Sequence, residues 1–178
     1  MGDDIPEGQE QKREREFNEI VLKYSPRIYK NVRGMVGTHE DTDDIIQETF
    51  LKAYKNIKSF KGEADVGTWL MRIALNIVFS RSRRKKIFTD NALEEFSNRL
   101  AANEKSPEER IVESERRRIV REGLSSLPEK QRAVFVLRMY DDLSFREISE
   151  IVGTSESASR ANFHQALNKL KLIAAAQS

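Results

Sequence analysis

Residues 59 to 86 read Ser59-Phe-Lys-Gly-Glu-Ala-Asp-Val-Gly-Thr-Trp-Leu-Met-Arg-Ile-Ala-Leu-Asn-Ile-Val-Phe-Ser-Arg-Ser-Arg-Arg-Lys-Lys86, and the rest of the chain is arranged around them. Gly62 and Gly67 loosen the first part of this stretch, and Asp65 suits the N-cap of a helix. Apolar residues then recur at helical spacing. They predict one buried face made of Trp69, Leu70, Ile73, Ala74, Ile77 and Val78.

The opposite face of this predicted helix is polar and ends in bases. Arg72, Asn76 and Arg83 lie about one or two turns apart, so they project on one side. Five of the six residues from Arg81 to Lys86 are cationic. This pattern favours a surface that binds nucleic acid. A basic last turn also complements the helix dipole, so a merely solvated helix end is the alternative.

The composition describes a chain of 178 residues with 38% apolar and 34% charged residues. This length holds one large or two small domains. The net charge is only +2 although Lys and Arg number 31. Any affinity for nucleic acid must therefore come from segregated charge and not from a globally basic surface.

Cysteine is absent, which excludes disulfides, thiol catalysis and Cys-ligated zinc and fits a reducing cytosol. The N-terminus is polar and has no apolar signal core. No stretch approaches the roughly 20 apolar residues that span a bilayer. We therefore expect a soluble, cytoplasmic protein without membrane insertion.

The chain before the central stretch predicts a disordered start over residues 1–10 and then two helices. Apolar residues from Phe17 to Met35 recur at helical spacing, and Pro26 either kinks this helix or opens a second one. A second helix is predicted from about Asp41 to Asn56, with acids first and lysines last. Its buried stripe is expected to be Ile46, Phe50, Ala53, Tyr54 and Ile57.

This pattern leaves a polar ridge with one apolar member on the outer face of the second helix: Asp44, Gln47, Glu48 and Leu51. An exposed leucine among acids indicates a protein partner. A solvated face with an incidental leucine is the alternative. A magnesium site from Asp41, Asp43, Asp44 and Glu48 is disfavoured, because adjacent acids on a helix point in different directions.

The periodicity fades between Ile87 and Ser106, which predicts a flexible linker over residues 87–106. The domains on either side would span residues 11–86 and 107–178. The second domain is expected to open with a helix from Pro107 that carries Ile111, Ile119, Val120 and Leu124. Another helix follows Leu127-Pro128, and Asp141-Asp142 break its pattern.

Ser144-Phe-Arg-Glu147 is a capping box, flanked by Leu143 and Ile148 in the positions of a hydrophobic staple. This short helix ends at Gly153, and Thr154 is expected to cap a last helix that runs to about Ala174. A short helix, a glycine turn and a longer helix predict a helix-turn-helix. A helical hairpin used only for packing is the alternative. The inward residues of the last helix are Phe163, Ala166, Leu170 and Ile173, and the outward ones are Ser157, Arg160, Ala161 and His164.

The motifs and their order resemble the extracytoplasmic-function class of bacterial RNA polymerase sigma factors. Three phrases resemble region 2 of that family: Asp43-Asp-Ile-Ile-Gln-Glu-Thr-Phe-Leu-Lys-Ala-Tyr54, Ser59-Phe-Lys-Gly-Glu63 and Thr68-Trp-Leu-Met-Arg-Ile-Ala-Leu-Asn76. Two resemble region 4: Leu127-Pro-Glu-Lys-Gln-Arg132 and Leu143-Ser-Phe-Arg-Glu-Ile-Ser-Glu-Ile-Val-Gly153. The resemblance implies an all-α fold of two small helical domains joined by a flexible linker, the second with a helix-turn-helix.

The resemblance also implies roles for single residues. The polar ridge would dock on the clamp helices of the polymerase β′ subunit. The loop Phe60, Lys61, Gly62, Glu63 and Ala64, together with Asn76, would hold a flipped base of the minus-ten element. Phosphates would be bound by Lys58, Lys61, Arg72, Arg83 and Arg84. The minus-35 element would be contacted by Arg146, Ser157, Arg160, Ala161 and His164.

The partners implied by the resemblance are core RNA polymerase (β′ clamp helices and β flap), promoter DNA and an anti-sigma protein, with no cofactor and no small-molecule substrate. A sigma-like decoy that binds a regulatory protein is the runner-up. An enzyme is disfavoured, since no nucleophile and base are paired and His39 and His164 lie far apart. The residues at Val66-Gly67 and from Ser157 to His164 differ from those usual in the family. The resemblance therefore implies no particular promoter sequence.

Overall fold

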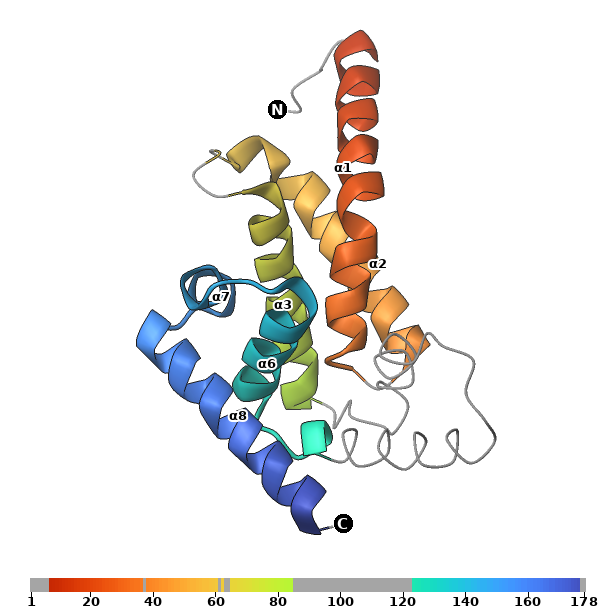
Figure 1. Cartoon of the computed structure of the whole chain (residues 1–178). Helices are drawn as coiled ribbons and strands as arrows, with labels where there is room; N and C mark the ends of the chain where they lie inside the picture. Colours follow the sequence, from red (N-terminus) through yellow and green to blue (C-terminus); the bar gives the residue numbers. More distant parts are fainter. Residues whose placement is uncertain (1–6, 37, 61, 63–64, 85–122, 177–178) are drawn as a thin grey trace, which may run out of the picture.

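The computed structural model describes residues 7–36, 38–60, 62, 65–84 and 123–176, and the elements found in them are helices (Figure 1). The first unit holds α1 (Glu7–Arg33), α2 (His39–Asn56), the 3-10 turn η1 (Ile57–Ser59) and α3 (Val66–Arg84). The second unit holds α6 (Glu129–Asp141), α7 (Phe145–Val152) and α8 (Glu156–Ala176). The all-α prediction is confirmed. The predicted linker, residues 87–106, and most of the helix expected after it lie outside the described residues.

Helix α1 is one continuous helix that contains Pro26, so the chain does not start a second helix there. It begins at Glu7, and the prediction of a disordered start is therefore wrong for residues 7–10. The reason is local. This segment is rich in Glu, Gln, Lys and Arg, which favour helix. An exposed pair between Lys12 and Glu16 at 3.9 Å, one turn apart, adds slightly to this preference.

Helix α2 begins two residues earlier than predicted, because Thr38 caps it. The Thr38 side chain accepts a hydrogen bond from the backbone N of Asp41 at 3.0 Å. The buried stripe is also turned from the predicted one and consists of Thr42, Ile45, Thr49, Phe50 and Ala53. Ile46, Tyr54 and Ile57 are only half-buried. Two threonines can face the core because their hydroxyls donate to carbonyls of the preceding turn.

Helix α3 is covered on more than one side. Asp65 caps it as predicted, since its carboxylate accepts from the backbone N of Gly67 at 2.9 Å and of Thr68 at 3.2 Å. The predicted face is largely buried, but Met71 and Leu75 are fully buried as well. These two were not expected. Helix α3 packs against α1 and α2 of the first unit and also against α7 of the second, which the sequence pattern of one helix cannot reveal.

The second unit is a helix-turn-helix preceded by α6. Helix α7 has the predicted capping box between Ser144 and Glu147, and Gly153 takes the left-handed conformation with φ of 69°. The cap of α8 differs from the prediction. Ser155 accepts from the backbone N of Ala158 at 3.1 Å, whereas the Thr154 hydroxyl bonds the buried hydroxyl of Ser159 at 2.8 Å. Helix α8 runs on to Ala176.

The main apolar core is shared by the two units. Residues of α6 and α7, among them Val136, Leu137 and Ile148, belong to the same buried cluster as Ile28 of α1 and Leu75 of α3. A smaller cluster around Leu124, Leu127, Phe135 and Ala166 belongs to the second unit alone. The units are thus two in chain order but packed together over a continuous apolar contact.

Candidate nucleic-acid and protein interfaces

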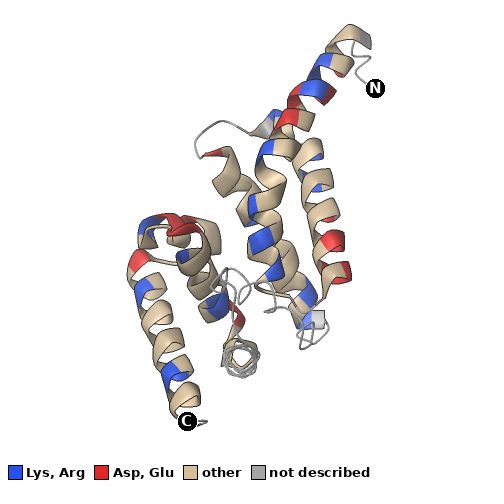
Figure 2. Ribbon diagram, turned by 45° about the vertical axis from the view of Figure 1, so that its right-hand side comes forward, with Lys and Arg blue, Asp and Glu red and all other residues tan. Residues whose placement is uncertain are grey.

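The polar ridge of α2 faces the solvent as predicted. Asp44, Gln47 and Leu51 are exposed, and Leu51 shows 62% of its surface. In the ribbon of Figure 2, the acidic positions of α2 (red) lie toward its start and the basic positions (blue) toward its end. An exposed leucine flanked by charge is the arrangement expected of a surface that docks on a protein partner.

Arg81 of α3 joins this ridge, which the sequence did not predict. Its guanidinium lies 2.8 Å from a carboxylate oxygen of Glu48 and 3.5 Å from one of Asp44. The hydrogen bond from Lys52 lowers the pKa of Glu48 most, and the hydrogen bond from Arg81 lowers it less. Together they hold this pKa below its ordinary value, although partial burial raises it. Glu48 therefore stays charged. The sequence indicated only that Arg81 opens a basic run.

The magnesium alternative receives no support from the geometry of α2. The Asp41 carboxylate is turned back to the N-cap, where it accepts from the Thr38 hydroxyl at 2.7 Å. Among the described residues no three acids or histidines are grouped so that they could hold a metal ion. The same residues also include no helix that combines the length and apolar content of a membrane crossing.

The loop before α3 places an aromatic wall beside the helix. The Phe60 ring packs on Trp69 with 4.9 Å between ring centroids and 36° between planes. Trp69 is half-buried and packs on the main core. Asn76 is exposed two turns further along α3 and lies on the same side as Trp69, not on the opposite face as predicted. Gly62 is exposed with a positive φ of 72°, whereas Lys61, Glu63 and Ala64 lie outside the described residues.

The basic residues of α3 have different surroundings. Arg72 donates from Nε at 2.9 Å and from Nη2 at 2.5 Å to the backbone carbonyl of Glu150 in α7. Arg83 donates to the carbonyl of Phe79 in its own helix at 3.2 Å. Lys58 is exposed in η1, and the side chain of Arg84 is not described. The structure thus brings Arg72, but not Arg83, against the second unit.

The outward face of α8 is as predicted: Ser157, Arg160, Ala161 and His164 are all exposed. Arg160 is held in place by its own unit. Its Nη2 lies 3.1 Å from a carboxylate oxygen of Glu156, and its guanidinium lies 4.8 Å from the centre of the Phe145 ring. Arg146 on α7 is exposed and pairs with Glu150 at 3.7 Å. Arg160 is thus an exposed arginine with a fixed orientation near the start of α8, and such an arginine suits contact with base edges.

Comparison with protein families finds two matches along the chain. Residues 20–87 match Sigma-70 region 2, and residues 117–170 match Sigma-70, region 4. The first match includes the polar ridge, the loop and α3. The second includes the helix-turn-helix.

Curated relatives cover most of the chain. It is 32% identical over 163 residues to the ECF RNA polymerase sigma factor SigW of Bacillus subtilis, covering 87% of each chain. It is 36% identical over 152 residues to the ECF RNA polymerase sigma-E factor of Salmonella typhimurium, covering 79% of each.

Solved structures share the fold. The sigma factor RpoE of Bartonella quintana, solved in complex with the anti-sigma factor NepR, aligns with a TM-score of 0.66 and 16% identity. That alignment covers 89% of this chain and 96% of the other. CnrH, solved in complex with the cytosolic domain of CnrY, aligns with a TM-score of 0.67 and 22% identity over 93% of this chain and 91% of the other.

Proposed function

Because this chain belongs to the extracytoplasmic-function class of RNA polymerase sigma factors, we propose that it binds core RNA polymerase and directs the recognition and melting of promoters. The observation that carries the proposal is the ordered pair of region 2 and region 4 matches along one chain. The chain does no chemistry of its own and takes no cofactor or small-molecule substrate. It works in the cytoplasm, where the polymerase is.

The polar ridge of α2 is proposed to dock on the β′ clamp helices. Leu51 would supply the apolar contact at the centre, and Asp44, Gln47 and Glu48 the polar contacts around it. The exposure of Leu51, 62%, supports this role, since an apolar anchor in a polar rim is the usual form of an interface hot spot. The second unit would contact the β flap, as the family resemblance implies.

Promoter DNA is proposed to be read at two places. The loop with Phe60 and Gly62, together with Asn76, would capture an unpaired base of the minus-ten element, because these residues offer an aromatic wall, a glycine that a base can approach closely and an amide. Lys58, Arg72 and Arg83 would bind phosphates beside it. The exposed face of α8 around Arg160, with Arg146 of α7, would read the minus-35 element in the major groove.

A regulatory protein of the anti-sigma type is a further proposed partner. RpoE of Bartonella quintana was solved in complex with the anti-sigma factor NepR, and CnrH in complex with the cytosolic domain of CnrY. Both units of this chain carry surfaces that are exposed when polymerase is absent. Cross-linked pull-downs from stressed cells that recover only polymerase subunits would contradict this part of the proposal.

The domain boundaries remain a proposal: residues 11–86 and 107–178, joined by residues 87–106. Limited proteolysis tests it. First cuts within residues 87–106 that leave two stable fragments would support it, and first cuts inside α2 or α6 would contradict it.

Run-off transcription tests the function itself. Purified chain and core polymerase are expected to initiate on promoters of the host genome, whereas a decoy would bind without initiating. Leu51→Ala should weaken core binding about tenfold, as loss of a hot-spot contact does. Leu22→Ala is the matched control, because Leu22 is 77% exposed on α1, outside the ridge and outside the unit proposed to contact the β flap. Equal effects of the two changes would contradict docking through the ridge.

A further inference from the structure

One residue in the first turns of α1 is turned toward α2, although its neighbours face the solvent. Of the side chains of residues 8–16, all are exposed except that of Arg13, which is half-buried. Its Nη2 donates at 3.0 Å to the backbone carbonyl of Tyr54 on α2. Its guanidinium also lies 4.6 Å from the centre of the Tyr54 ring, which is within the range of a cation–π contact. The first turns of α1 therefore reach α2 through Arg13.

This contact falls on the last turn of α2. Tyr54 lies two residues before Asn56, where the helix ends. The last four carbonyls of an α-helix have no partner within the helix. An arginine near that end can bind them, and its charge complements the helix dipole. Arg13 thus supplies from α1 a hydrogen bond that stabilises the end of α2.

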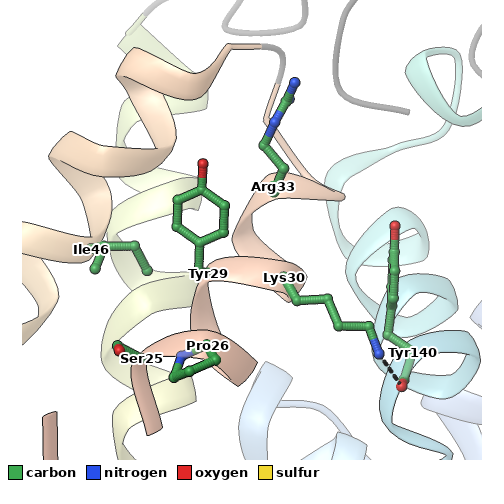
Figure 3. A pocket seen from close by; sticks show the side chains of 7 residues that line it. All are labelled: Ser25, Pro26, Tyr29, Lys30, Arg33, Ile46 and Tyr140. Atoms are coloured by element: carbon green, nitrogen blue, oxygen red, sulfur yellow. Dashed lines mark hydrogen bonds between the residues drawn. The ribbon is translucent and has the colours of Figure 1, made fainter. Parts of the chain in front are cut away.

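The two helices are in close contact around Arg13 but not along their whole length. Phe17, one turn after Arg13 on α1, packs edge-on against the Tyr54 ring with 5.1 Å between ring centroids. Near the middle of α2 a cavity of about 400 Å³ opens, and Tyr29 of α1 and Ile46 of α2 are among the residues that line it (Figure 3). A cavity deprives its walls of dispersion contacts. The position of the last turn of α2 against α1 therefore depends on Arg13 and Phe17.

The end of α2 leads directly into the loop that is proposed to capture a base. The turn η1 (Ile57–Ser59) follows Asn56 with no residue between them. The backbone N of Phe60 then donates to the carbonyl of Ile57 at 3.2 Å, and the Phe60 ring packs on Trp69. Hydrogen-bonded elements of this kind carry a displacement along the chain. A shift of the last turn of α2 should therefore move Phe60.

We propose that Arg13 is a positioning residue for promoter opening. It fixes the end of α2 and thereby holds Phe60 against Trp69, where Phe60 forms the aromatic wall of the loop. Arg13 acts through the backbone of α2 and η1 and needs no contact with DNA. The part that concerns promoter opening rests on the proposed function.

Trp69 reports on Phe60 without any DNA or polymerase, because the chain contains a single tryptophan. Arg13→Met removes the charge and the donors but keeps an apolar stem and a similar helix propensity. It should let Phe60 move away from Trp69. We expect acrylamide to quench the Trp69 fluorescence more strongly and the emission to shift to longer wavelength. Phe60→Ala gives the upper limit of both changes.

The same substitution two residues later is the matched control. Arg15→Met removes an exposed arginine from the same helix and should leave the quenching and the emission unchanged. Arg13→Lys keeps a charged donor for the Tyr54 carbonyl, although it loses the planar guanidinium. It should restore most of the parent behaviour. Circular dichroism checks that each variant keeps its helices, and Arg13→Lys decides the matter if Arg13→Met does not fold.

Promoter opening, measured by permanganate footprinting, tests the functional part. Arg13→Met should lower opening about tenfold, the factor that corresponds to the loss of one hydrogen bond from a charged donor. Arg15→Met should leave opening unchanged, and core binding should be the same for all variants. If Arg13 acts through Phe60, the two residues are coupled. Adding Arg13→Met to Phe60→Ala should then cost little more than Phe60→Ala alone.

Each part of the inference has an outcome that would overturn it. Quenching of Trp69 in Arg13→Met equal to that in Arg15→Met would overturn the positioning of Phe60. A full additional loss of opening in the Phe60→Ala background would overturn action through Phe60. Stronger quenching with normal opening, while Phe60→Ala impairs opening, would overturn the role of Arg13 in opening and leave base capture intact. If Phe60→Ala itself leaves opening unchanged, the proposed base capture by Phe60 fails, and the fluorescence still confirms or contradicts the positioning.

Discussion

The two surfaces proposed to read DNA are built in different ways. On α8 the reading residue Arg160 is oriented by Glu156 one turn earlier and by Phe145 of the adjoining α7, all within one helix-turn-helix. On α3 two of the basic residues are engaged by other parts of the fold. Arg72 is bonded to a carbonyl of the second unit, and Arg81 is paired with the acids of α2.

The geometry of the α8 surface is therefore fixed within its own helix-turn-helix, whereas the geometry of the α3 surface depends on how the rest of the chain packs around α3. The α8 face is set by contacts within the second unit. The α3 face depends on the packing of α7, because the partner of Arg72 is a backbone carbonyl of α7. Single substitutions can test this contrast. We expect a defect in promoter opening when Asn76 of α3 is changed, and a defect in upstream sequence preference when Arg160 of α8 is changed.

Asn76→Ala should have the largest effect, a loss of promoter opening. The contact of Asn76 with the captured base helps to offset the free energy that is needed to unstack that base. We expect promoter opening to fall about a hundredfold, which corresponds to about 3 kcal/mol. The Asn76 side chain is exposed, and no hydrogen bond to it is seen within the described residues. The melting temperature should therefore stay unchanged.

Opening is measured by permanganate footprinting on duplex and on pre-melted promoters, with core binding as the control. Unimpaired core binding with poor opening is the expected pattern. A lowered melting temperature would contradict the proposal, because it would give Asn76 a structural role.

Arg160→Ala should have a smaller and more local effect. A bidentate contact to guanine is worth about 1–3 kcal/mol of discrimination, so preference at one or two upstream base pairs should relax about tenfold. Transcription from a pre-melted template should hardly change. The measurement uses promoters with a randomised upstream element.

Phosphate binding by Arg160 would give a different pattern. All upstream sequences would weaken together, with a smaller salt dependence. Identical defects of Arg160→Ala and Asn76→Ala on both templates would contradict the division between the two faces.

Local sequence signals explain what could be predicted from the sequence. The capping box of Ser144 and Glu147, the turn at Gly153 and the outward face of α8 follow from spacing within one element. The exceptions also have physical causes. Met71 and Leu75 are buried because a second unit covers α3, and nothing within α3 itself signals that contact.

The same distinction applies to the candidate site. The exposure of the ridge followed from helical periodicity, whereas its pairing with Arg81 depends on how α2 and α3 cross. The contact of Arg72 with Glu150 joins residues far apart in the chain, so no spacing rule could predict it. Thr154 and Ser155 are adjacent hydroxyl residues that give the same N-cap signal, so the sequence alone does not distinguish the true cap, Ser155, from its neighbour.

Ser144→Ala tests how far the second unit depends on its local signals. The loss of the cap should lower the free energy of unfolding by about 1 kcal/mol. Ser149→Ala is the matched control within the same helix, because its hydroxyl only donates to the carbonyl of Arg146 at 2.6 Å. Urea unfolding of the full chain measures both. If both changes lower the free energy of unfolding equally, the capping box does not stabilise α7 more than an ordinary side-chain hydrogen bond does.

Arg81→Gln should give the smallest effect and tests the pairing of α3 with the ridge. Partly exposed ion pairs contribute little, so we expect a loss of about 0.5 kcal/mol at neutral pH in urea unfolding. The pKa of Glu48 is lowered in the folded chain, first by its hydrogen bond with Lys52 and then by that with Arg81, from an ordinary value of 4.5. A carboxyl with a lowered folded pKa stabilises the fold above its unfolded pKa, and this contribution is lost as the pH falls through the folded value. The difference between Arg81→Gln and the parent chain should therefore be present at neutral pH and shrink in acid below 4.5. Lys52→Gln should show the same trend. A difference that stays constant in acid would mean that Arg81 acts through the packing of its aliphatic stem and not through its charge.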